Sequence, residues 1–213
     1  MENIEQQENR RFTILGEEFF YVCIVGIIFA FLGWTVENIT RIIDSGVIDS
    51  RFHLMPFISP YGLIPFAFLI LNSPDDLALF GHHFFKEKTK ENRIRSNIAC
   101  FFLICGLVFF GELIVGYIWG EVFGYSLWNY SNIPLHITPY TGVLTTLAFG
   151  TGVYLLFKFV YRPLLKLVKM MHYRTAKIIS LMVWPLMILD TVCMGLQIVF
   201  LGEARLWWEI KVF

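Results

Sequence analysis

The sequence FFLICGLVFFGELIVGYIWG, Phe101 to Gly120, is an almost unbroken apolar run that contains one carboxylate, Glu112. About twenty apolar residues are enough for a helix to cross the hydrocarbon core of a bilayer. A carboxylate within such a helix is costly in lipid, so it normally faces protein or water and often has a function. We therefore expect Glu112 to bind a substrate or a proton, and a structural hydrogen bond to a neighbouring helix is the competing interpretation.

The rest of the chain follows the same pattern. Of 213 residues, 56% are hydrophobic and 16% are charged, and the mean hydropathy is +0.62; soluble domains have about 25% charged residues. This composition predicts an all-α integral membrane protein with one transmembrane domain. Five spans are expected, at 19–43, 57–80, 98–120, 138–161 and 178–201. Prolines and glycines should break the second span, and residues 162–177 should form an amphipathic helix on the cytoplasmic membrane surface.

Positive charge is unevenly distributed between the loops. Thirteen of the 17 lysines and arginines fall in the N-terminal segment and in the second and fourth loops, and four fall on the opposite side. The positive-inside rule then places the N-terminus in the cytoplasm and the C-terminus outside. The polar start is followed by no cleavage signal, so the first apolar block should stay as a membrane helix. The net charge is zero, which gives no reason to expect a nucleic-acid partner.

Small residues recur at helical spacing in two of the expected spans. Spacings of three and four residues let another helix approach closely. The predicted packing positions are Gly26, Ala30, Gly33, Gly116, Gly120 and Gly124. Five spans enclose little volume, so we expect a homodimer or a larger membrane complex.

Three further carboxylates lie in or beside the spans. Glu37 could join Glu112 in one polar cluster, or form an ion pair with Arg41 one helical turn later. Asp190 shares a helix face with Gln197, and either function or bonding between helices would explain this polar face. Glu121 is expected to be a solvated charge at the headgroup level.

Two segments outside the spans are also candidates. The loop after the third span has the motif Trp128-Asn129-Tyr130-Ser131, which could form either the mouth of a substrate site or a lid at the membrane interface. The basic residues Lys166, Lys169 and Arg174 could dock a cytoplasmic ATPase subunit or bind anionic lipid headgroups.

The sequence contains no recognisable catalytic or metal-binding motif. All four cysteines lie within apolar blocks, and none is spaced as a metal-binding pair. Nucleotide-binding, protease and hydrolase motifs are lacking. We therefore expect a protein that is not an enzyme and that needs no cofactor or metal.

Several of these residues together resemble the CmpB-like bacterial membrane proteins, the type IV ABC-transporter permease family. The resemblance is carried by Phe31-Leu32-Gly33-Trp34 with Glu37, by Pro56 through Pro60-Tyr61-Gly62, by Glu112 with Gly116, and by the loop motif at Trp128. Asn129 stands where the family pattern has Asp, and Phe149 where it has Trp, as in a divergent member. The resemblance implies a transport component of the bacterial plasma membrane, with any ATPase on a separate chain.

These observations lead to one main functional expectation and one alternative. The first is a permease-like subunit of an ABC-type or related transporter, with substrate or protons handled near Glu112, Glu37 and Asp190. The alternative is a non-transporting assembly or regulatory subunit that binds another membrane protein. A membrane enzyme would need nucleophilic or metal-binding groups gathered at one depth, and the sequence does not suggest such a group.

Overall fold

Long apolar helices make up most of the molecule. The computed structural model describes residues 11–213 and is 63% helical. In this range four helical segments are long and apolar enough to cross a membrane. They are α2 (Phe19–Ser45), α5 (Lys90–Tyr117) with the π-helical turn η1 (Ile118–Val122), the run of α6 (Val143–Leu155), η2 (Leu156–Tyr161) and α7 (Arg162–Val168), and α8 (Tyr173–Leu201). The shorter α3 (Ser59–Gly62) and α4 (Ile64–Leu71) form a fifth helical segment, so the expected all-α membrane fold is confirmed.

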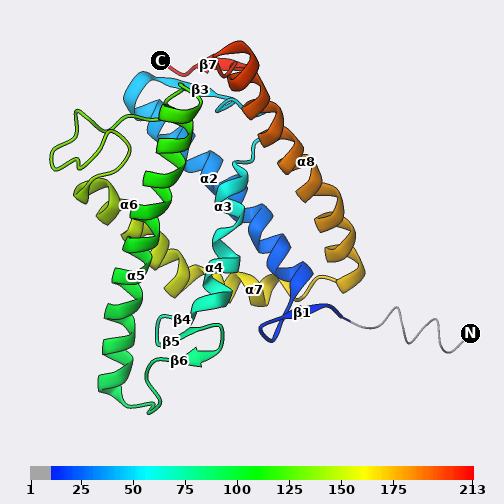
Figure 1. Cartoon of the computed structure of the whole chain (residues 1–213). Helices are drawn as coiled ribbons and strands as arrows, with labels where there is room; N and C mark the ends of the chain where they lie inside the picture. Colours follow the sequence, from blue (N-terminus) through cyan, green and yellow to red (C-terminus); the bar gives the residue numbers. More distant parts are fainter. Residues whose placement is uncertain (1–10) are drawn as a thin grey trace, which may run out of the picture.

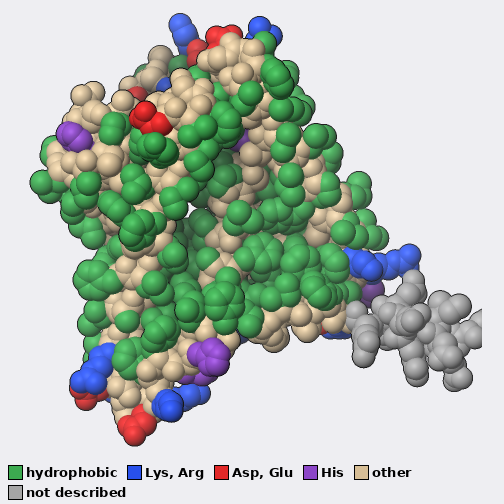
Figure 2. All heavy atoms as spheres, in the orientation of Figure 1, with side chains coloured by type: hydrophobic (Ala, Val, Ile, Leu, Met, Phe, Trp, Pro, Cys, Tyr) green, Lys and Arg blue, Asp and Glu red, His purple; other side chains and the backbone are tan. Residues whose placement is uncertain are grey.

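The helices run between two polar ends of the molecule (Figure 1). Helix α8 packs along α2. Helices α3 and α4 also lie against α2, and α5 packs along α6. One end carries β1 (Thr13–Ile14), paired with β2 (Glu17–Glu18), and the other carries the C-terminus. Figure 2 shows hydrophobic side chains over the middle of the molecule and charged side chains at the two ends. We call the end with β1 the inner end and the other the outer end. Residues 1–10, including the Arg10 of the charge comparison, lie outside the described range.

The second span differs from its predicted range of 57–80. Its helix ends at Leu71 because Asn72 has φ 64° and ψ −80°, a conformation that cannot continue a helix. A three-stranded antiparallel sheet follows, made of β4 (Asn72–Ser73), β5 (Asp76–Leu79) and β6 (His82–His83). The Ser96 hydroxyl of α5 holds this sheet, because it accepts from the Leu77 N–H at 2.7 Å and donates to the Pro74 carbonyl at 2.8 Å. Of the apolar residues after 71, Leu77 and Ala78 are buried against the inner end of the bundle, and Leu79 and Phe80 are exposed.

The expected amphipathic segment over 162–177 is also divided differently. Helix α7 continues directly from η2 and ends at Val168, a turn follows, and α8 begins at Tyr173. Figure 1 shows α7 crossing the inner end beside α2 and α4. Leu165 and Val168 are buried there, so the apolar side of α7 packs on protein.

An aromatic core fills the inner half of the bundle. The rings of Phe68 from α4 and Phe157 from η2 stack with centroids 4.2 Å apart, and Tyr161 lies edge-on to Phe68. Residues of α2, α5 and α7 complete this cluster. The inner ends of the helices are thus fixed by apolar packing.

Polar contacts and a short sheet close the outer end. Strand β3 (Val47–Asp49) follows α2 and pairs antiparallel with β7 (Glu209–Lys211), with Val47 opposite Lys211. The Asp49 carboxylate is fully buried, and it accepts from the Arg41 side chain at 3.0 Å. These contacts fix the chain just before Arg51 and His53, which lie beside the candidate site.

Candidate functional site

Glu112 is half-buried in the outer half of α5 and binds only neutral side chains. Its Oε1 accepts from the Tyr130 hydroxyl at 3.3 Å, and its Oε2 accepts from the Thr141 hydroxyl at 3.1 Å. Within residues 11–213, no lysine, arginine or histidine lies within 4.0 Å of this carboxylate. A carboxylate at this depth without a cationic partner is costly in a membrane.

Glu37 has a different environment because it has a cationic partner. Its Oε2 accepts from Arg51 Nη2 at 2.8 Å, and its Oε1 accepts from the Tyr61 hydroxyl at 3.0 Å. The alternative ion pair with Arg41 is not formed, because β3 brings Asp49 next to Arg41. Glu37 therefore joins α2 to the loop after β3 and to α3.

The charges of both carboxylates, Glu37 and Glu112, act on the Tyr130 hydroxyl. Burial raises the pKa of the Tyr130 hydroxyl, and the charges of Glu112 and Glu37 raise it further. The Tyr130 hydroxyl is therefore within electrostatic range of both carboxylates. We define the carboxylate cluster as Glu37, Arg51, Tyr61, Glu112, Tyr130 and Thr141. The structure thus brings Glu37 and Glu112 into one polar neighbourhood.

The loop motif lies directly over this cluster. Trp128 Nε1 donates to the Tyr140 carbonyl at 2.8 Å, and the Tyr130 N–H donates to the Pro139 carbonyl at 2.7 Å. The Asn129 side chain accepts from the Ser131 N–H at 2.8 Å, and both residues are exposed. The aromatic members of the motif therefore hold the loop, and the polar members face out.

The small residues of α5 and η1 contact this loop. Gly116 and Gly120 lie so close to the Tyr140 side chain that an added Cβ would clash with it. Gly124 follows the helix with φ 71°, and an added Cβ there would meet no atom within 4 Å. The three glycines were expected to contact another helix, but Gly116 and Gly120 accommodate Tyr140, and Gly124 contacts neither a helix nor Tyr140. Glu121 is exposed and accepts from the Tyr140 hydroxyl at 2.9 Å.

The small residues of α2 do contact a helix. A Cβ at Gly26 would lie 2.6 Å from the Gly62 carbonyl oxygen, and one at Gly33 would clash with the Tyr61 ring. The Ala30 carbonyl accepts from the Ile58 N–H at 3.1 Å. This stripe sets α3 against α2 and so places the Tyr61 hydroxyl on Glu37.

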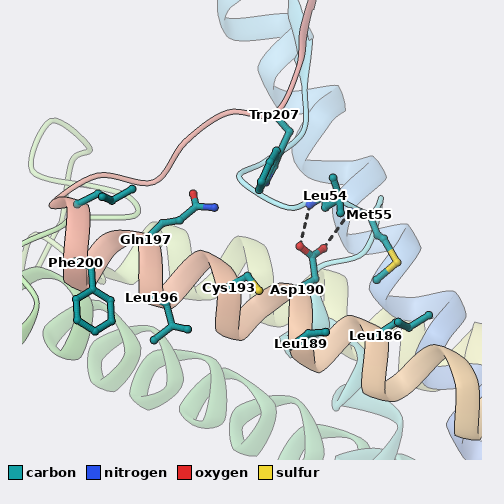
Figure 3. Close-up of a pocket in the computed structure, with 11 residues that line it drawn as sticks. Leu54, Met55, Leu186, Leu189, Asp190, Cys193, Leu196, Gln197, Phe200 and Trp207 are labelled. Atoms are coloured by element: carbon teal, nitrogen blue, oxygen red, sulfur yellow. Dashed lines mark hydrogen bonds between the residues drawn. The ribbon is translucent and has the colours of Figure 1, made fainter.

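Asp190 shares no hydrogen bond or ion pair with the described members of the carboxylate cluster, and it anchors the chain before α3. Its two oxygens accept from the N–H groups of Leu54 and Met55 at 2.9 and 3.0 Å (Figure 3). His53 Nδ1 lies 3.7 Å from Asp190 Oδ2, and no hydrogen bond is assigned to this buried atom. Sequence reasoning missed His53 because no other candidate residue stands near it in the chain. Asp190 and Gln197 line a groove of about 530 Å³ along α8.

The predicted docking residues lie at the inner end. Lys169 and Arg162 form ion pairs with Glu17 of β2. Lys166 and Arg174 are exposed and have no ion pair among the described residues. Residues 11–213 also contain no group of three His, Cys, Asp or Glu side chains placed to hold a metal ion.

Fold and composition together define a multi-pass helical membrane protein. A family model described as "Putative ABC-transporter type IV" matches residues 24–194, and the chain belongs to this family. The matched range includes every member of the carboxylate cluster. Searches of curated proteins and of solved structures gave no match.

Proposed function

We propose that this chain is a permease-like subunit of an ABC-type or related transporter, and that Glu112 handles a proton or a cationic group of the substrate. The family supports a role in transport. The observation that carries the site is the environment of Glu112, which binds two neutral hydroxyls. Its charge is balanced by no cation in the described chain, so it can accept one.

The partners of Glu112 suit such an exchange. Tyr130 belongs to the loop, and Thr141 lies just before α6. Each hydroxyl can leave the carboxylate if the loop shifts, and a substrate ammonium or a proton can take its place. Glu37 is already paired with Arg51. We therefore assign it two supporting roles, which are to accept the hydrogen bond of Tyr61 and to act through its charge on the Tyr130 hydroxyl.

The remaining parts of the proposal concern assembly. A separate ATPase would dock at the inner end, where Lys166 and Arg174 are exposed. The N-terminus would then be cytoplasmic and the C-terminus outside, in a bacterial plasma membrane. One chain with five helical segments is too small to enclose a pathway, and a homodimer would provide it.

The first test is purification of the native complex in mild detergent, followed by mass spectrometry of the proteins that stay bound. An ATPase that copurifies in a fixed ratio is the expected result. Recovery of this chain alone, as an oligomer, would contradict the ABC assignment.

The second test compares Glu112→Gln with Glu121→Gln in that complex. Glu112→Gln should lower substrate-stimulated ATPase activity by about tenfold, the effect of losing one charged hydrogen bond worth roughly 1.4 kcal/mol. Glu121→Gln is the matched control, because it changes an exposed carboxylate that also binds one tyrosine hydroxyl. Equal activities of both variants would remove Glu112 from the mechanism.

The hydrogen bonding of Glu37 and Asp190 favours a second candidate, a non-transporting assembly or regulatory subunit. Both carboxylates are bound by groups of this chain, as a purely structural role requires. In that case Glu112→Gln would leave the activity of the complex unchanged, and deletion of the chain would reduce the amount of its partner.

A further inference from the structure

The groove along α8 is separate from the carboxylate cluster, and its shape is elongated. Its floor is the face of α8 that carries Leu186, Leu189, Cys193 and Leu196, which recur at helical spacing. Leu54, Met55 and Trp207 form the wall (Figure 3). From Leu186 to Leu201 the groove follows fifteen residue steps of the helix, about 22 Å at ~1.5 Å per residue.

These dimensions match an extended hydrocarbon chain. One leaflet of a bilayer has a hydrocarbon thickness of about 15 Å, half of the total, so the groove is long enough to hold a chain that crosses one leaflet. Its volume of about 530 Å³ is also within the range of roughly 300–1,000 Å³ for small-molecule sites. The groove opens along a membrane helix whose neighbouring side chains are exposed, so lipid can enter from the side.

The outer end of the groove is polar. Gln197 Oε1 accepts from the Arg205 N–H at 3.3 Å, and the Gln197 amide nitrogen has no hydrogen-bond partner in the described part of the chain. The Arg205 side chain is exposed and has no ion pair among these residues. Gln197 places this amide donor at the end of the apolar groove, and the backbone of Arg205 bonds to that side chain. The exposed guanidinium of Arg205 thus belongs to a residue adjoining the groove end, and an amide donor and a cation there complement a phosphate attached to a hydrocarbon chain.

Asp190 lies seven residues before Gln197 on α8, about 10 Å away along the helix at ~1.5 Å per residue, so a phosphate at Gln197 does not contact it. Both of its oxygens are occupied by backbone N–H groups, and it is 8% exposed. We propose that this groove binds one acyl chain of an anionic phospholipid, with the phosphate at Gln197 and Arg205. This inference is independent of the transport proposal.

The test uses the full chain in bilayer nanodiscs that contain phosphatidylglycerol with a diazirine on one acyl chain. After illumination, mass spectrometry locates the adducts. We expect adducts on Leu189, Cys193 and Leu196 to exceed those on Val192 and Val199 by about tenfold, the preference of a retained chain over passing lipid. The two valines are exposed on the same helix and do not line the groove. An even distribution over all five residues would refute the site.

A filled groove gives the second readout. Cys193→Trp places an indole in the groove, and Val199→Trp places one outside it. Native mass spectrometry should show about tenfold less bound phosphatidylglycerol for Cys193→Trp and no change for Val199→Trp. Arg205→Gln should weaken retention of phosphatidylglycerol more than retention of phosphatidylcholine. Equal retention by Cys193→Trp and wild type, or a disulfide between Cys193 residues of two copies, would overturn the proposal. The wild-type adduct map decides the matter if Cys193→Trp does not fold.

Discussion

The contact between Asp190 and the chain before α3 provides the sharpest prediction about stability. Asp190→Ala removes both acceptors of the Leu54 and Met55 N–H groups. No other partner is assigned to these two N–H groups. The substitution also removes the carboxylate nearest to the buried His53.

The magnitude follows from the hydrogen bonds. A buried donor left without an acceptor costs about 1–3 kcal/mol. Leu54 and Met55 form the wall of the apolar groove, so water does not replace the lost acceptors and the whole range applies to each. The total is about 2–6 kcal/mol for the pair. For a chain of this length, each kcal/mol shifts the melting temperature by about 2–4 °C, so Asp190→Ala should melt at least about 4 °C below wild type.

Thermal unfolding in mild detergent, followed by circular dichroism, measures this shift. The melting temperature of Asp190→Asn should fall by about half as much as that of Asp190→Ala, because the amide keeps one acceptor oxygen. Gln197→Ala is the control on the same helix, since it loses one bond of 3.3 Å at the polar rim and should melt within about 2 °C of wild type. A melting temperature of Asp190→Ala equal to that of the control would refute the anchoring role.

Three further outcomes follow from the same structure. Gly26→Leu should destabilise the fold by about 1–3 kcal/mol, because a Cβ there lies 2.6 Å from the Gly62 carbonyl oxygen; Gly106→Leu, at a site with no atom within 4 Å, should melt like wild type. Burial lowers the pKa of His53, and this effect exceeds that of the Asp190 and Glu37 charges, which raise the pKa. Below about pH 6.5 the unfolded chain therefore binds a proton at His53 that the folded chain does not bind, and the stability of the fold falls. His53→Gln should flatten that decline in a series of melting curves. Glu17→Gln, which breaks two partly exposed ion pairs, should cost less than about 1 kcal/mol in chemical unfolding.

Apolar blocks and their spacing were sufficient to predict the helical membrane fold. The second span shows where this reasoning fails. Residues 72–80 include Pro74, Asp75 and Asp76, and Asn72 adopts a positive φ, so the helix stops at Leu71 and the chain turns into a sheet held by Ser96. The apolar residues beyond this break lie in β5, where Leu77 and Ala78 are buried by protein.

The sequence left two interpretations of Glu37 open, a polar cluster with Glu112 or an ion pair with Arg41. In the structure Glu37 binds Arg51 and Tyr61, and the charges of Glu37 and Glu112 both raise the pKa of the Tyr130 hydroxyl. Arg41 was the local candidate partner for Glu37, but a non-local residue, Arg51, occupies that role. Helical spacing identifies neighbours on one helix, whereas β3 and the loops decide which charges meet across the fold.

The two halves of the molecule are held by different interactions, and this difference bears on mechanism. Stacked and buried aromatic rings fix the inner half, where many packing contacts act together, because helices in lipid are held by van der Waals packing. In the outer half the loop over Glu112 is held mainly by single hydrogen bonds, each worth about 0.5–1.5 kcal/mol net. A rearrangement that opens Glu112 therefore costs least at the loop and leaves the inner core intact. Helices α2, α5 and α6 run from the inner core toward the carboxylate cluster, so coupling to an ATPase at the inner end would act through one or more of them.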